Sequence, residues 1–202
     1  MALKLTKNEL RTQQIRLSQF QRYLPTLQLK KAMLKFEVSL AQMELSRLRD
    51  EMHLTRHQVE DFAPFLLEKV DVNLLLYADV LHVKKHYENI AGVEIPIFDT
   101  IIFRDADYSL FDTPVWADRA TEILREFATV REKMSIAEEK KRALEKELRA
   151  VSIRVNLFEK ILIPRSQGNI KKIRIFLSDQ QLASVAQAKV AKKKIALKRA
   201  AQ

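Results

Sequence analysis

The chain has 202 residues, 47% of them hydrophobic, with two glycines and five prolines, a composition typical of long helices rather than of disordered segments. It contains no cysteine, which excludes disulfide frames, cysteine-based zinc sites and thiol chemistry. The net charge of +10 is uneven, because residues 165–202 hold ten basic side chains and one acid, whereas residues 63–116 hold four basic and nine acidic ones. Such asymmetry guides docking and partner choice.

Heptad spacing dominates residues 3–62. Apolar side chains recur there at alternating intervals of three and four, which is the pattern of a coiled-coil seam. The phase continues through Pro25, so we expect a bend there rather than a helix end, and we expect Pro64 to mark a stop or a kink. The seam positions predicted in this part of the chain are Leu10, Leu17, Leu24, Leu27, Leu34 and Leu48.

Residues 63–116 lose the heptad phase and form a predicted head. β-Branched and aromatic residues become frequent over Val80–Tyr87 and Val93–Phe103, and the turn-like segment Glu88–Gly92 lies between these two runs. This pattern predicts a β-hairpin. Pro96 cannot donate a ladder hydrogen bond, so its strand is expected at an edge of the sheet.

A second heptad stretch begins near Ala117. Thr113 or Asp112 is expected to cap this helix, with Pro114 at an early helical position. The phase is strict to Leu162, but Pro164 interrupts it, so we expect the helix to be kinked or re-phased there. The seam positions predicted in this second part are Phe127, Leu144, Leu148, Val151, Val155 and Phe158.

Two seams in one chain predict that it folds back on itself. The expected fold class is all-α, an elongated antiparallel two-helix coiled coil with a small irregular or β-hairpin head between the helices. The expected division is residues 1–62 for the first helix, 63–116 for the head and 117–202 for the second helix. Residues 178–202 would then extend past the N-terminus as a single helix. This helix ends in a basic tip, which we define as Lys189, Lys192, Lys193, Lys194, Lys198 and Arg199.

The residues do not predict an active site. His53 and His57 lie four apart on one helix face, a spacing that suits zinc, but the glutamate of a metallohydrolase motif and a third ligand are both missing. Asp105 and Asp107 resemble a fragment of a cation-binding loop without the glutamate that an EF-hand needs. Two glycines leave no phosphate-cradling loop. We therefore expect no catalytic role, no cofactor and no bound metal.

The sequence also lacks the features of a membrane-inserted or a nucleic-acid-binding protein. The chain has no run of 18 apolar residues, and its N-terminus lacks the apolar region of a signal peptide, so we expect a cytoplasmic protein without direct membrane insertion. The tip lysines could contact phosphates, but no aromatic side chain follows Phe176 to stack on bases. We expect no nucleic acid partner.

Three segments carry a family resemblance in a fixed order. They are Leu29–Leu34 (LKKAML), Ala91–Phe98 (AGVEIPIF) and Val155–Pro164 (VNLFEKILIP), the last followed by Asn169–Ile173 and a lysine-rich helix. Together they resemble the D-subunit of V-type (vacuolar, archaeal and bacterial A/V-type) rotary ATPases. Two stretches depart from that family's pattern, namely Arg22–Thr26, where the family usually has Ala-x-x-Gly, and Ser178–Ala188, which has few of its acidic residues.

The resemblance implies a central-stalk rotor subunit, without catalytic residues of its own, that passes torque between a catalytic hexamer of A- and B-type subunits and an ion-translocating membrane ring. It also implies two further partners, a small rotor subunit and a ring-coupling subunit, and a peripheral place on the membrane. We expect the basic tip to contact the hexamer and the acidic head to meet the other rotor subunits. The residues alone leave a coiled-coil scaffold or tether as the alternative.

Overall fold

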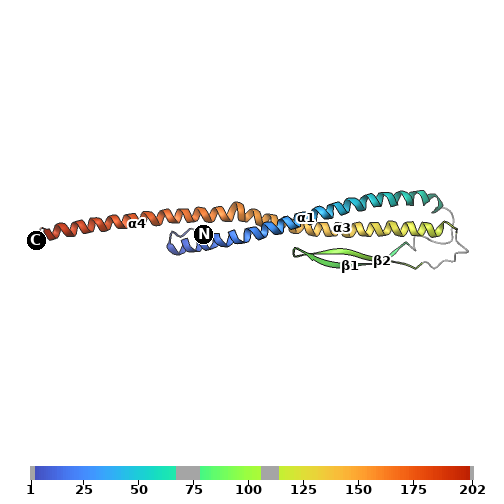
Figure 1. Ribbon diagram of the computed structural model, residues 1–202, viewed down its shortest axis with the longest axis horizontal. Helices are drawn as coiled ribbons and strands as arrows, with labels where there is room; N and C mark the ends of the chain where they lie inside the picture. The colour runs from blue at the N-terminus through green and yellow to red at the C-terminus, as the bar shows by residue number, and fades with distance from the viewer. Residues whose placement is uncertain (1–2, 67–77, 106–113, 201–202) are drawn as a thin grey trace. The chain divides into compact units, whose positions relative to one another are not determined.

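The computed structural model describes residues 3–66, 78–105 and 114–200, without the side chains of Phe62, Phe65, Leu66 and residues 198–200. The fold consists of two long helical segments and a β-hairpin that lies between them in the sequence, as the sequence predicts (Figure 1). The elements in chain order are α1 (Lys7–Leu66), β1 (Val80–Ile90), β2 (Val93–Phe103), α3 (Ala117–Leu157), the π-helical turn η1 (Phe158–Leu162) and α4 (Ile163–Ala200).

The chain forms two compact units, and both helical segments contribute to each of them. The terminal unit consists of Met1–Leu29 and Val151–Gln202, and the central unit consists of Lys30–Ala150. In the central unit the helices are antiparallel, since Lys30 pairs with Glu147 and Glu44 with Lys140. In the terminal unit the rings of Phe20 and Phe158 meet edge to face, with centroids 5.3 Å apart.

Helix α1 starts at a side-chain cap from Thr6 and continues through both of its prolines. The Thr6 side-chain oxygen accepts a hydrogen bond from the backbone N–H of Glu9, and this Thr-x-x-Glu spacing is typical of a helix start. The helix continues past Pro25, as predicted, but it also passes Pro64 and ends only at Leu66. The predicted end near Phe62 was therefore wrong. A proline in the final turn removes one hydrogen bond where solvent can satisfy the freed carbonyl, so the helix tolerates it.

The core of the central unit is the stripe where α1 meets α3. Leu34 and Leu144 are fully buried, and Leu45, Leu48 and Ala137 form a single apolar cluster. Burying a leucine side chain contributes about 1.5–3 kcal/mol, so a few such layers provide most of the attraction between the two helices.

The β-hairpin has a two-residue turn at Ala91 and Gly92, with φ values of 52° and 79°. Positive φ at both positions gives the turn whose twist matches the flanking strands. The side-chain oxygen of Asn89 accepts a hydrogen bond from the Gly92 N–H at 2.9 Å. Because the turn needs only two residues, β1 continues to Ile90 rather than ending at Tyr87 as predicted. The described sheet has two antiparallel strands, so Pro96 does lie on an edge strand.

The π-helical turn η1 absorbs one extra residue in the heptad pattern of the terminal unit. It lies directly before Pro164, and the backbone N–H of Ile163 bonds to the carbonyl of Phe158, five residues back. A π turn holds about one residue more than an α turn. The spacing along the inward face is 4-3-4-4-4-3, one residue more than heptads allow, through Val151, Val155, Phe158, Leu162, Ser166, Ile170 and Ile173. Without η1, the later residues of this stripe would turn away from α1.

The capping residues expected before α3, Asp112 and Thr113, lie outside the described part of the chain, as does Asp107. Pro114 is described and lies just before the helix, where its carbonyl accepts a hydrogen bond from the N–H of Ala117 at 3.0 Å. Pro114 therefore belongs to the turn that leads into α3 rather than to its first helical positions.

Candidate functional site

All twelve side chains predicted for the seam are buried or half-buried. Each lies within one of the two units, and none is as exposed as the outward-facing residues of the same helices. The buried ones are Leu34, Leu48, Leu144, Val151 and Val155, and the half-buried ones are Leu10, Leu17, Leu24, Leu27, Phe127, Leu148 and Phe158.

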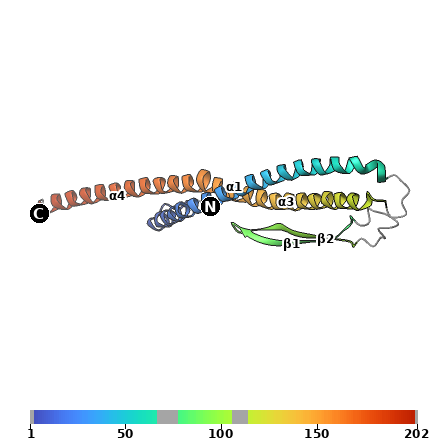
Figure 2. The ribbon, with the colours of Figure 1, turned by 45° about the vertical axis from the view of Figure 1, so that its right-hand side comes forward.

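The hairpin lies along α3 in the central unit (Figure 2). Charged side chains of α3 contact it at intervals. The Lys85 ammonium is 3.1 Å from the Glu139 carboxylate. The Lys133 ammonium lies 5.5 Å from the centre of the Phe98 ring. The hydrogen bond with Glu139 is the main cause of a raised pKa for Lys85. The contacts of Lys85 and Lys133 hold the hairpin against α3 by electrostatic attraction, in addition to apolar packing.

Arg125 contacts the end of the hairpin opposite its turn. Its guanidinium lies 5.4 Å from the centre of the Phe103 ring, and it donates a hydrogen bond to the Arg104 carbonyl at 2.7 Å. Along β2 the contacted residue numbers rise while along α3 they fall, so β2 runs antiparallel to α3. The hairpin is thus aligned with the helix over much of the length of both elements.

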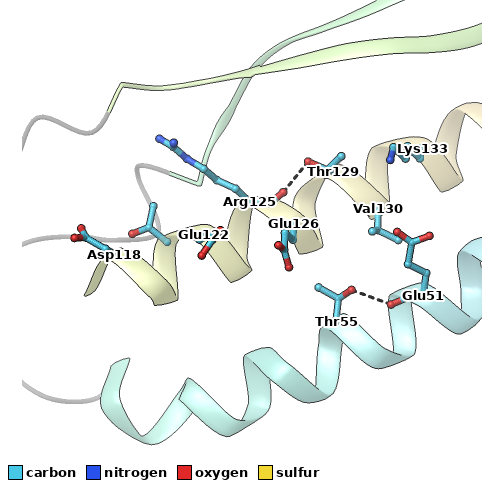
Figure 3. Close-up of a pocket in the computed structure, with 10 residues that line it drawn as sticks. Glu51, Thr55, Asp118, Glu122, Arg125, Glu126, Thr129, Val130 and Lys133 are labelled. Carbon is cyan, nitrogen blue, oxygen red and sulfur yellow. Dashed lines mark hydrogen bonds between the residues drawn. The ribbon is translucent and has the colours of Figure 1, made fainter. Parts of the chain in front are cut away.

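A groove of about 660 Å³ lies between α1 and α3 in the central unit (Figure 3). Four carboxylates line it, together with three threonines and two basic side chains. The Thr55 and Thr129 hydroxyls donate to backbone carbonyls of their own helices at 2.8 Å. Thr121 does the same at 2.9 Å. The hydroxyls are thus used by the helices and are not poised as nucleophiles. The four carboxylates that line the groove are those of Glu51, Asp118, Glu122 and Glu126.

The histidines singled out as possible zinc ligands are exposed. His57 contacts Glu60 at 3.3 Å on its own helix. Over residues 3–66, 78–105 and 114–200, no group of three or more His, Cys, Asp or Glu side chains is arranged to hold a metal ion. Asp105 is described and exposed.

A different histidine has a defined electrostatic environment. On the hairpin, the Nδ1 atom of His86 lies 2.7 Å from the Asp99 carboxylate, and its Nε2 atom lies 3.5 Å from Glu88. The hydrogen bond with Asp99 is the main cause of a raised pKa for His86. This cross-strand pair makes His86 the described histidine with the clearest link between protonation and local structure.

The C-terminal part of α4, which we call bare, buries no side chain against another described element. Every side chain from residue 178 to residue 197 is exposed, including Lys189, Lys192, Lys193 and Lys194 of the basic tip, while Ile173 is the last fully buried side chain before it. The side chains of Lys198 and Arg199 lie outside the described part. No helix among the described residues is long and apolar enough to cross a membrane.

The sequence interpretation missed a second apolar stripe on α1. Met33, Phe36, Leu40 and Met43 follow the same alternating spacing of three and four, but they are between 39% and 61% exposed. At about 100° per residue they lie roughly opposite Leu34 and Leu45, on the face turned away from α3. We call these four residues the outer stripe. The spacing alone could have revealed it, since it repeats the coiled-coil pattern in a second phase.

The described residues therefore define a helical-hairpin protein that carries a docked β-hairpin, a bare basic helix and an unpaired apolar stripe. Residues 9–193 match the ATP synthase D-subunit family. The chain is 45% identical over 194 residues to the V-type ATP synthase D-subunit of Chlamydia caviae, covering 96% of this chain and 93% of that one. It is 44% identical over 194 residues to the protein of that name from Chlamydia abortus, with the same coverage.

Another relative is matched over slightly more of its own length. The V-type ATP synthase D-subunit of Chlamydia trachomatis serovar L2 is 42% identical over 200 residues, covering 96% of each chain. The chain belongs to the ATP synthase D-subunit family, which confirms the resemblance seen in its motifs. It is accordingly a subunit of a rotary ATPase.

Proposed function

We propose that the chain is the central-stalk rotor of a V-type ATP synthase or ATPase. In this role it passes torque between a catalytic hexamer of A- and B-type subunits and an ion-translocating membrane ring. The family match over residues 9–193 carries the proposal. ATP is made or hydrolysed on the hexamer, and this chain contributes no reacting group or cofactor. The complex holds it at the membrane periphery on the cytoplasmic side.

The helices have the continuity that torque transmission requires. Helix α1 is 60 residues long and has no break at either proline. From Ala117 to Ala200 the second segment passes from α3 through η1 into α4 without a non-helical residue. Side chains that interlock across a helix pair resist sliding and twisting of one helix against the other. These features support a role as a shaft.

The two kinds of charged surface fit different contacts. The exposed lysines of the basic tip suit the interior of the hexamer, because solvated ion pairs contribute only about 0–1 kcal/mol each and can exchange as a rotor turns. The acidic region around the hairpin and the groove suits stable docking of the small rotor subunit or the ring-coupling subunit. The outer stripe supports the same assignment, since it offers an apolar helix face to a partner.

A reversible cross-link tests the rotor role. The chain has no cysteine, so Lys193→Cys would introduce a single thiol. The variant would be reconstituted with catalytic subunits that carry one cysteine facing the shaft. Oxidation should stop ATP turnover in the cross-linked fraction, and reduction should restore it. The control is the same variant with cysteine-free catalytic subunits. Full turnover in a fully cross-linked complex would show that the chain does not rotate against the hexamer.

A further inference from the structure

The hairpin is attached to the central helices by few buried side chains. Among the described residues of β1 and β2, only Ile95 and Pro96 are buried, and Ile95 is fully so. The helix pair beneath is built differently, since Leu34, Leu45 and Leu144 are all at most 2% exposed. Leu45, Leu48 and Ala137 form an apolar cluster that contains residues of α1 and α3 and no hairpin residue.

Beside these two residues and the half-buried apolar side chains of β2, the hairpin is attached by partly exposed contacts of a charge with a charge or of a charge with a ring. In the ion pair of Lys85 with Glu139, the two side chains are 35% and 53% exposed. Lys133 over Phe98 and Arg125 over Phe103 are cation–π contacts. Contacts of this kind at exposed sites are individually weak, and salt screens the charged ones.

The packing between β2 and the helices also contains a gap. A partly open pocket of about 210 Å³ lies between part of β2 and the two helices. Its apolar lining comes from both sides of the interface, with Pro96, Ile97 and Phe98 on the hairpin and Leu48, Ile136 and Ala137 on the helices. Atoms beside a gap lose the dispersion contacts that close packing would supply, so this interface is weaker than its area suggests.

We propose that the β-hairpin is a strap that opens away from the helix pair as one unit while α1 and α3 stay paired. The inference rests on contacts within the central unit and is independent of the rotor role. The docked hairpin is the major state, because Ile95 is fully buried in it. Opening also loosens the strands themselves, since an isolated two-stranded hairpin is marginal in water. The backbone amides of β1 and β2 should therefore exchange through this local opening.

Hydrogen exchange on the full-length chain, read by mass spectrometry on peptides, tests the strap. Peptides from β1 and β2 should exchange through an opening of lower free energy than peptides covering Leu34–Leu48 or Ala137–Leu148. Lys133→Gln should raise hairpin exchange about two- to five-fold, which corresponds to the loss of one exposed cation–π contact, and leave the helix peptides unchanged. Raising the salt concentration should act in the same direction.

The matched control is Arg131→Gln. Arg131 is exposed and pairs with the neighbouring Glu132 of α3 at 3.2 Å, so its loss should leave hairpin exchange unchanged. Equal opening free energies for the hairpin and the helices would show that the hairpin opens only when the whole unit unfolds. An equal rise in both sets of peptides on Lys133→Gln would show the same. Either result overturns the proposal.

Discussion

The ammonium of Lys30 lies 3.0 Å from the carboxylate of Glu147, and the two side chains are only 31% and 30% exposed. This pair connects α1 to α3. It also lies beneath the hairpin turn, because a Cβ atom at Gly92 would be 3.6 Å from the Lys30 Nζ atom. Three segments far apart in the sequence therefore meet at one partly shielded charge pair.

Removing this charge pair should weaken the central unit measurably. We expect Glu147→Gln to lower the free energy of unfolding by about 1 kcal/mol, at the upper end for partly exposed pairs, because shielding from solvent strengthens the attraction. Denaturant unfolding at low and high salt would measure the loss. The control is Glu145→Gln, whose partner Lys141 is on the same helix at 3.6 Å, and it should cost no more than about 0.5 kcal/mol. Equal losses in the two variants would contradict a special role for the pair.

Leucines on opposite faces of the helices should differ sharply in their contribution. Leu144 is fully buried, so Leu144→Ala should lower the free energy of unfolding by about 2–5 kcal/mol. Leu148 is half-buried, and Leu148→Ala should cost less than Leu144→Ala. The control is Leu54→Ala at a position 68% exposed, where we expect a change within about 0.5 kcal/mol. Thermal and denaturant unfolding would rank the three, and a loss for Leu144→Ala no larger than that for Leu54→Ala would mean that Leu144 is not in the seam.

Deleting one residue near η1 should be tolerated, because that segment contains one residue more than heptad spacing requires. Deletion of Pro164 restores unbroken heptad spacing from Val151 to Ile173 and removes the missing backbone donor, so the melting temperature should stay the same or rise. The control is deletion of the exposed Lys146, which turns the following stripe by about 100° and should lower the melting temperature clearly. If both deletions destabilise the chain equally, η1 does not compensate for the extra residue.

The His86–Asp99 pair predicts a pH dependence for the hairpin. The pKa of His86 is raised above 6.5, chiefly by Asp99, so protonation favours the folded hairpin. Its contribution is complete below the pKa of the unfolded chain and disappears as the pH rises from about 6.5 through the raised folded pKa. Hydrogen exchange of β1 and β2, corrected for the intrinsic pH effect, should therefore speed up across that window. His86→Gln should abolish the change and His82→Gln should keep it. A dependence that survives His86→Gln would rule the pair out.

The basic tip should contribute to assembly through diffuse attraction. On the proposed role, truncation at Lys189 should weaken binding to the catalytic hexamer and reduce coupled turnover. Both deficits should be largest at low salt, because higher salt already screens the attraction of the intact tip. Replacing Lys192, Lys193 and Lys194 with glutamine should reproduce part of the loss. Equal assembly and coupling of the truncated and intact chains at all salt concentrations would show that the tip is dispensable.

The regular parts of the fold were predictable because they follow a period. Heptads identified the faces on which Leu34 and Leu144 are buried, and β-branched runs identified β2 to the residue. The outer stripe was not predicted because a coiled-coil helix normally carries one apolar phase, although Phe36 and Leu40 repeat the spacing in a second phase. The sequence showed that the pattern shifts near Pro164, but a kink and a π turn can absorb the same extra residue. Only the backbone distinguishes them.

The docking of the hairpin could not be predicted for a different reason. The contact of Lys133 with Phe98 joins residues from two elements whose relative placement no local pattern determines. The same holds for Lys85 and Glu139. A lysine on an exposed helix face has the same sequence signature whether it meets water or an aromatic ring.

The bare part of α4, residues 178–197, has a consequence for the thermodynamics of assembly. A single helix without tertiary contacts is marginal in water, so in the free subunit this segment is only marginally stable as a helix. Binding must then supply the entropy lost when the segment becomes fully helical. The intrinsic helix propensity of this segment therefore affects its affinity for the hexamer, even at positions whose side chains make no contact with it. Alanine-to-glycine changes at Ala183 or Ala188 would weaken binding without removing a contact, and a helix-stabilising solvent would offset them.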